Sequence, residues 1–230
     1  MRTHSLTLAV AAAALFAAPA LADTQTYDVR NFDGLDVSSG IKVFYETGVA
    51  RSVVVENKDG DFDDIIVEVD DGDLVLKRPR KMGWSGKRTP YTVRVGVESL
   101  TEVEASSGSY VEGDGLSGAD AEIDVSSGAS VQIINVSVGE IELESTSGSS
   151  LTASGTCETV EADASSGATV EAGDLQCANL VADVSSGASI RAYATDSVNA
   201  DASSGGSVRV TGGATNVIID KSSGGSVSVS

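Results

Sequence analysis

The chain has 230 residues and a formal charge of −19, with 34 acidic and 15 basic side chains. This acidic balance opposes binding to nucleic acid and to anionic membrane surfaces. The only histidine is His4, so the rest of the chain cannot supply the histidine of a Ser-His-Asp or Cys-His catalytic pair or of a zinc site.

Residues 1–22 have the pattern of a secretory signal peptide. Arg2 gives a positive start, an apolar run covers residues 6–18, and residues 20–22 (Ala-Leu-Ala) form a small-residue cleavage site. The apolar run is shorter than the roughly 20 residues of a membrane-spanning helix. We therefore expect a bacterial periplasmic, secreted or cell-envelope protein without membrane insertion, with one domain over residues 23–230.

Residues 23–100 are expected to form irregular first coils that cap one end of the fold. Asp71-Gly72 has the composition of a tight hairpin turn. The segments predicted to be strands by alternation and β-branched content are 52–56, 65–69, 74–77 and 91–97.

Residues 59–64 hold four aspartates and, together with Asp70, imitate part of an EF-hand calcium loop. The glycine that such a loop needs at its sixth position is replaced by Asp64, and predicted strands flank the segment. A solvated loop is the favoured interpretation, and a calcium site is the alternative.

A basic segment runs from residue 77 to residue 88 around the only tryptophan. Cations around one aromatic ring can hold a phosphate, an acidic sugar or an acidic protein surface. The alternative is a solvated loop, or one folded back onto acidic side chains. The candidate contact residues are Lys77, Arg78, Arg80, Lys81, Trp84, Lys87 and Arg88.

A Ser-Ser-Gly motif, once Thr-Ser-Gly, recurs along the chain and defines a repeat. From Gly108 onward its glycines are 18–20 residues apart, without helix-forming runs between them. Such a period predicts one solenoid coil per repeat, with the motif as a corner where glycine adopts a positive φ. The glycines are Gly40, Gly108, Gly128, Gly148, Gly167, Gly187, Gly205 and Gly224.

Apolar residues keep a fixed distance from each repeat glycine. The neighbours of these residues alternate between polar and apolar, which is typical of half-buried strands. Stacked at about 4.8 Å, the coils would align the apolar residues into internal columns. Three residues after the glycines stand Val43, Val111, Val131, Leu151, Val170, Ile190, Val208 and Val227, and five before them stand Leu35, Val103, Ile123, Leu143, Ala162, Ala182, Ala200 and Ile219. The sequence predicts an all-β parallel solenoid, regular over residues 101–230.

The two cysteines test this register independently. Cys157 and Cys177 each lie ten residues before a repeat glycine. Equivalent positions of adjacent coils fall within the roughly 4.4–6.8 Å Cα separation of a disulfide. We predict a structural Cys157–Cys177 disulfide, which an oxidising compartment would preserve.

An acidic residue stands four positions before each repeat glycine. Because the flanking apolar residues point inward, these carboxylates should form an outward stripe. Two interpretations stay open: a solvated stripe, or calcium bridging successive carboxylates. The residues are Asp36, Glu104, Asp124, Glu144, Asp163, Asp183, Asp201 and Asp220, and the last six are the candidate metal ligands.

The whole pattern resembles the head GIN domain family, described as autotransporter adhesin heads. The resemblance covers residues 27–230 and implies a right-handed β-helix, a bacterial envelope setting, adhesion and no catalytic residues. It is carried by the segments 32–37 (FDGLDV), 40–43 (GIKV), 71–76 (DGDLVL), 91–95 (YTVRV) and 100–108 (LTEVEASSG), followed by the Ser-Ser-Gly coils.

Three functional hypotheses follow. The first is a non-catalytic binding or adhesion module that contacts envelope polysaccharide or protein through the solenoid face and the basic segment. The second is a structural envelope protein that self-associates by stacking through its final coil, whose edge is expected to be open. The third, less favoured, is a carbohydrate-active enzyme, because the uniform acidic stripe sets no carboxylate pair apart.

Overall fold

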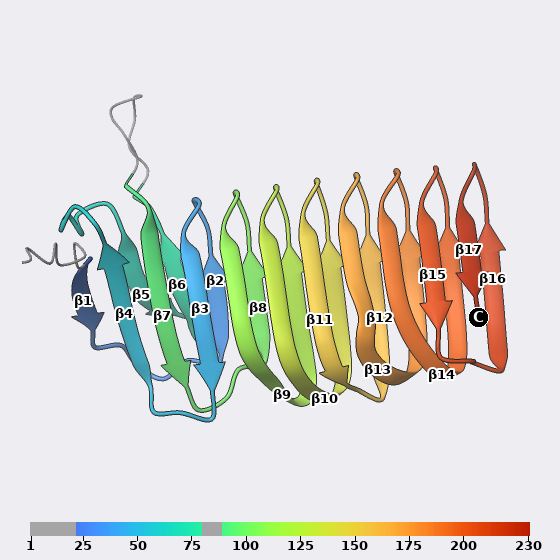
Figure 1. Cartoon of the computed structure of the whole chain (residues 1–230), viewed down its shortest axis with the longest axis horizontal. Helices are drawn as coiled ribbons and strands as arrows, with labels where there is room; N and C mark the ends of the chain where they lie inside the picture. Colours follow the sequence, from blue (N-terminus) through green and yellow to red (C-terminus); the bar gives the residue numbers. More distant parts are fainter. Residues whose placement is uncertain (1–21, 80–88) are drawn as a thin grey trace, which may run out of the picture.

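The computed structural model describes residues 22–79 and 89–230, and over these ranges it contains strands and turns but no helix. The strands stack side by side along one long axis (Figure 1). Each regular coil descends on the near side and rises on the far side as the coils advance toward the C-terminus, which is a right-handed path. The predicted all-β solenoid is confirmed. The predicted signal peptide lies almost entirely outside the described residues.

The regular coils pair in parallel with the register that the repeat predicts. Val131, for example, pairs with Val111 on one side and with Leu151 on the other. The longer strands run along one face, bend, and return along the other. The strands are β8 (Glu102–Ala105), β9 (Tyr110–Val125), β10 (Ser130–Ser145), β11 (Ser150–Thr156), β12 (Thr159–Ala164), β13 (Thr169–Val184), β14 (Ser189–Ala202), β15 (Ser207–Thr211), β16 (Asn216–Lys221) and β17 (Ser226–Val229).

The Ser-Ser-Gly corner uses two consecutive residues with positive φ. In one such corner φ is 54° at Ser107 and 72° at Gly108, and Ser109 N–H donates to the Ser106 carbonyl at 3.1 Å. The left-handed glycine was predicted. The positive φ of the serine before it was not predicted, because this conformation is uncommon for residues with a Cβ.

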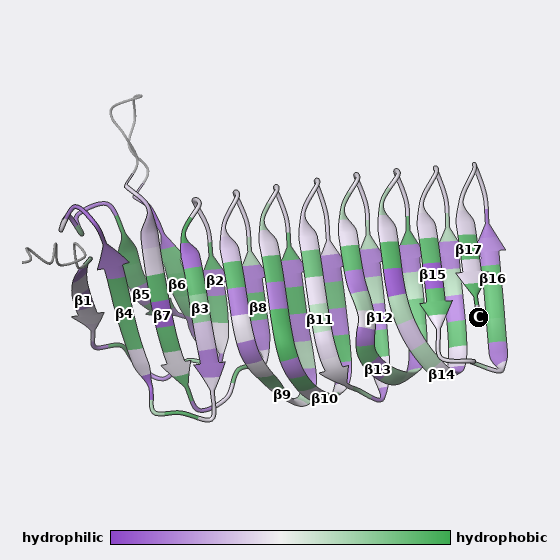
Figure 2. Cartoon of the chain, viewed as in Figure 1, coloured by the Kyte–Doolittle hydropathy of each residue, from purple (hydrophilic) through white to green (hydrophobic). Residues whose placement is uncertain are grey.

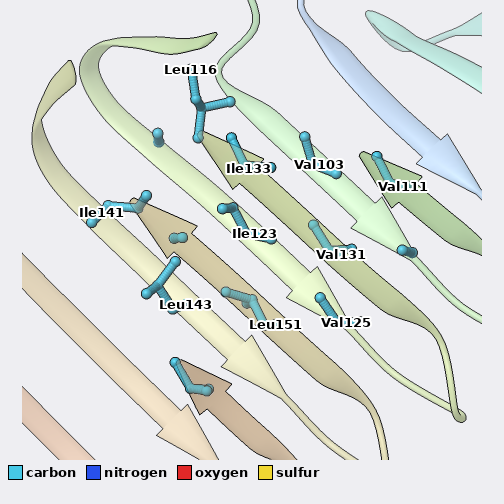
Figure 3. Close-up of a cluster of buried hydrophobic side chains, with 14 of the residues drawn as sticks. Val103, Val111, Leu116, Ile123, Val125, Val131, Ile133, Ile141, Leu143 and Leu151 are labelled. Carbon is cyan, nitrogen blue, oxygen red and sulfur yellow. The ribbon is translucent and has the colours of Figure 1, made fainter. Parts of the chain in front are cut away.

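Inward side chains form the predicted columns. Val131, Ile133, Ile123 and Leu143 are at most 1 % exposed, and they meet between the two faces of the coils (Figure 3). Outward positions of the same strands are mostly polar, which gives the alternating bands of Figure 2. Burying one aliphatic side chain per position stabilises the fold by roughly 1.5–3 kcal/mol before entropy is counted, so the stacked columns are its main support.

Strands also form at the four segments predicted among residues 23–100, and their arrangement shows an order that the sequence did not reveal. The pair β2–β3 lies between the pair β6–β7 and the regular coils, because β2 pairs with β6 and β8 while β3 pairs with β7 and β9. Three antiparallel pairs, β1–β4, β4–β7 and β5–β6, close this end. The strands are β1 (Asp23–Tyr27), β2 (Gly34–Val37), β3 (Lys42–Thr47), β4 (Ser52–Asn57), β5 (Ile66–Asp70), β6 (Asp73–Lys77) and β7 (Tyr91–Val97).

Two predicted local features are confirmed. Asp71 and Gly72 have φ values of 48° and 110° and join β5 to β6 as a two-residue hairpin turn. Cys157 and Cys177 form a disulfide with their Cα atoms 4.6 Å apart.

At the other end, β16 and β17 pair only with strands of the preceding coil within the described residues. Two inward apolar side chains of β16 are therefore partly uncovered: Val217 is 41 % and Ile219 37 % exposed. Ile218 lies between them at an outward position, paired with the exposed Asn199, and is 65 % exposed.

Candidate ligand-binding surfaces

The acidic residues align into one continuous ladder. Glu104 pairs with Asp36 and Asp124, Glu144 with Asp124 and Asp163, and the register continues to Asp220. The side chains are half-buried or exposed on the outer face of the returning half-coils. The structure thus brings the predicted stripe residues together in the predicted order.

A second acidic column, which the sequence reasoning missed, lies beside the ladder. Glu122 pairs with Glu102 and Glu142, and Glu142 pairs with Glu161. Together with Asp120 and Glu140, these side chains line a hollow of about 370 Å³. Their signal in the sequence is an acid two residues before the ladder acid in several consecutive repeats.

Crowding and partial burial change the acidity of the ladder. Burial raises the pKa of Asp163 to about 6, and repulsion from Glu161 and Asp183 adds to the effect. Burial also raises the pKa of Asp36, Asp124 and Glu144 above their ordinary values. These four carboxyl groups therefore hold protons more tightly than isolated carboxyl groups do.

The described residues contain no group of three or more His, Cys, Asp or Glu side chains arranged to hold a metal ion. In the acidic loop, Asp59 N–H donates to Asn57 Oδ1 at 2.8 Å, and Asp63 N–H donates to Asp61 Oδ1 at 2.9 Å, so two side-chain oxygens serve local turns. Calcium bridging stays a prediction. It is tested by comparing the thermal midpoint in calcium and in sodium chloride at matched ionic strength.

The first two residues of the basic segment are engaged within the fold. Lys77 forms an ion pair with Glu68 at 2.9 Å. The Arg78 side chain, 7 % exposed, pairs with Asp64 at 2.6 Å, and its guanidinium lies 4.7 Å from the centre of the Tyr91 ring. Arg78 thus clamps the acidic loop against β7. Arg80, Lys81, Trp84, Lys87 and Arg88 lie outside the described residues.

A different cluster of aromatic and cationic side chains lies on the outer face of the descending half-coils. We call Lys42, Phe44, Arg94 and Tyr110 the Phe44 cluster. The rings of Phe44 and Tyr110 meet edge to face with their centres 6.4 Å apart. Lys42 Nζ lies 4.9 Å from the Phe44 centre and 4.6 Å from the Tyr110 centre, and Arg94 Cζ lies 5.4 Å from Phe44.

A hollow of about 780 Å³ adjoins this cluster. Phe44 and Arg94 contribute to its wall, and the loop after β3 contributes Val49 and Ala50. Sequence reasoning missed this site because Phe44 and Arg94 become paired neighbours only when β3 inserts beside β7.

Comparison with known proteins identifies the family of this chain. Residues 31–214 match the family described as "Putative auto-transporter adhesin, head GIN domain". The chain belongs to this family. The resemblance noted from the sequence is therefore confirmed. No curated protein sequence matches the chain.

Solved structures share the architecture of this head GIN domain. A putative adhesin from Bacteroides fragilis superposes with a TM-score of 0.80 at 19 % identity, covering 90 % of this chain and 96 % of that one. A putative adhesin and a putative lipid binding protein, both from Parabacteroides distasonis, each give a TM-score of 0.69 at 16 % and 15 % identity, again covering 90 % of this chain and 96 % of theirs. At such identities the likeness shows a common fold.

Proposed function

We propose that this head GIN domain is an exported, non-catalytic binding module of the bacterial envelope that holds polysaccharide or protein on its solenoid surface. The observation that supports this most is the repetition of its outer chemistry. Ladder acids recur in register from Asp36 to Asp220, and equivalent groups are spaced by about 4.8 Å. A long surface with one repeated chemistry suits an extended partner better than a single small substrate.

The export part of the proposal rests on two observations. The N-terminal residues have the signal-peptide pattern, and the Cys157–Cys177 disulfide is a bond that persists in oxidising compartments. The described ranges contain no helix long and apolar enough to cross a membrane. The adhesin names of the family and of several structural neighbours fit an envelope role.

The ladder carboxylates support the non-catalytic part of the proposal. An acid–base pair for glycoside cleavage needs two carboxyl groups whose environments move their pKa values apart. In the ladder, the pKa shifts of Asp36, Glu104, Asp124, Glu144 and Asp163 all have the same direction, upward. None of these five is therefore shifted in the direction opposite to its neighbours.

The test is to apply the purified protein to an array of bacterial and host glycans and immobilised envelope proteins, beside a variant with residues 77–88 neutralised. Selective retention without release of sugar supports a binding module, and loss in the variant locates the contact on the basic segment. If the array retains nothing, or if polysaccharide is cleaved, the proposal fails.

A second candidate function, self-association, is favoured by the uncovered apolar side chains of β16. Exposed apolar strand edges pair readily with another chain, and the inward side chains of Val217 and Ile219 are 41 % and 37 % exposed at this end. Stacking of two copies through β16 and β17 would cover both, as the equivalent Val198 and Ala200 are covered by the next coil. Light scattering over a concentration series tests this: a dimer that Val217→Lys converts to a monomer supports stacking, and a stable monomer excludes it.

A further inference from the structure

We infer that the Phe44 cluster and the adjoining hollow form a binding site for a neutral saccharide. This inference rests on the proposed binding function and gives it a ligand class and a location. The site is separate from the acidic ladder, because it lies on the outer face of the descending half-coils, whereas the ladder lies on the returning half-coils.

The solenoid does not need aromatic rings at these positions. Along the outward column that starts at Phe44, the paired residues of the following coils are Glu112, Gln132 and Thr152. Along the column that starts at Lys42, Tyr110 is followed by Ser130 and Ser150. The regular coils thus carry polar side chains at these sites. Phe44 and Tyr110 stand out among them, and both remain partly exposed.

The hollow supplies an apolar contact surface of suitable size. Its volume of about 780 Å³ lies within the roughly 300–1,000 Å³ usual for small-ligand sites. Phe44, Val54, Val49 and Ala50 give it apolar lining, and Val49 is 36 % exposed. A pyranose ring presents a face of C–H groups that packs against such a surface, and an aromatic ring adds a specific contact geometry.

Polar side chains around the apolar lining of the hollow can form hydrogen bonds with the hydroxyl groups of a sugar. Arg94 uses Nε to donate to Glu56 at 2.6 Å, and no other hydrogen bond of its guanidinium is formed within the described residues. Its terminal N–H groups can therefore donate to ligand oxygens. Glu46 and Asp114 in the lining can accept from hydroxyl hydrogens.

The balance of charge selects a neutral ligand. Lys42 and Arg94 flank Phe44, and four carboxylates lie around them, those of Glu46, Glu56, Glu112 and Asp114. An anionic sugar would meet these carboxylates on a chain whose formal charge is −19. A cationic ligand would meet the two cations that already cover the Phe44 ring. A polyol, which both donates and accepts without charge, meets neither repulsion.

The experiment titrates the full protein with short neutral oligosaccharides of hexose and N-acetylhexosamine, and with uronic-acid oligosaccharides of matched length. Phe44→Ala removes the ring, Phe44→Leu keeps apolar bulk without a ring, and Arg94→Gln removes the guanidinium. Thr152→Ala is the matched control, because it lies in the same outward column on a later coil. Thermal unfolding of each variant confirms that it is folded.

We expect the neutral oligosaccharides to bind. Phe44→Ala and Phe44→Leu should weaken this binding on the order of tenfold or more, and Thr152→Ala should leave the affinity unchanged. Glycan binding that survives all Phe44 and Arg94 changes would overturn the site while leaving the proposed function intact. Preference for the uronic-acid series, or binding of protein partners alone, would overturn the ligand class and leave a binding module. If neither oligosaccharide series binds, the inferred saccharide site is overturned, and the array of glycans and envelope proteins decides the proposed function separately.

Discussion

The Tyr45 ring occupies the space that a side chain at Gly113 would need. The two residues are paired across β3 and β9, and a Cβ placed on Gly113 would lie 2.1 Å from ring atoms of Tyr45. In the inward column at this junction, the largest side chain, that of Tyr45, lies beside Gly113, which has none. The next two coils fill the same position with Ile133 and Ala153. This pairing joins the irregular coils to the regular ones.

Gly113→Ala is therefore expected to destabilise the protein by about 1–3 kcal/mol, because the added methyl overpacks the junction. Chemical denaturation measures the change. Gly173→Ala is the matched control, since a Cβ at Gly173 meets nothing within 4 Å. Combining Gly113→Ala with Tyr45→Val should recover part of the loss, and equal stability of the two single alanine variants would refute the packing account.

Tyr45→Phe should stabilise the protein. The Tyr45 side chain is buried, and its hydroxyl has no hydrogen-bond partner among the described residues. Burying an unpaired hydroxyl costs about 1–3 kcal/mol, so we expect a gain on the order of 1 kcal/mol when it is removed. A higher denaturation midpoint supports this prediction, and a loss of stability would show that the hydroxyl is satisfied.

Reduction of the disulfide should lower stability without changing the fold. Cys157 and Cys177 are 20 residues apart, and cross-links over loops of this size contribute about 3 kcal/mol. The parallel ladders on both sides hold the register independently, so far-ultraviolet circular dichroism should stay unchanged. The Cys157→Ala/Cys177→Ala variant should match the reduced protein and be insensitive to reductant. Collapse of the strand signal on reduction would contradict this division of roles.

Mild acid should stabilise the protein through the acidic ladder. In the folded state the pKa of Asp163 is raised to about 6 from its ordinary value of 3.8. The folded form therefore binds this proton more tightly, and stability is lost as pH rises from about 4 through about 6. Because Asp163 is partly exposed, we expect a gain of only about 1 kcal/mol for Asp163→Asn at neutral pH.

Denaturation at pH values on either side of this window tests the prediction. Asp163→Asn should flatten the pH dependence between them, while Asp196→Asn, at an exposed position off the ladder, should leave it unchanged. A protein that becomes more stable as pH rises through the window would refute the sign of the effect.

Much of the fold could be predicted from the sequence because the repeat fixes the register. The spacing from Gly108 onward places Val111, Val131 and Leu151 in one column and brings Cys157 to Cys177, since equivalent residues of stacked coils must meet. The insertion of β2–β3 beside β6–β7 could not be predicted. It depends on long-range pairing that no local pattern marks, and for this reason the juxtaposition of Phe44 with Arg94 was missed as well.

The acidic ladder was predictable for the same reason, whereas the second column is acidic in only four of the eight repeats, at Glu102, Glu122, Glu142 and Glu161, and is a weaker signal in the sequence. The left-handed serine at each corner was also missed. Its conformation is imposed by closure of the corner between two faces, and serine composition alone signals only a turn.

The most direct test of the central claim is nuclear magnetic resonance of protein labelled at phenylalanine and tyrosine, titrated with neutral oligosaccharides. The account predicts that the Phe44 and Tyr110 signals shift in a saturable way, that buried Tyr91 does not respond, and that the sugar is recovered uncleaved. Unchanged Phe44 and Tyr110 signals throughout the titration, or cleaved sugar, would contradict the account of this domain as a glycan-binding module.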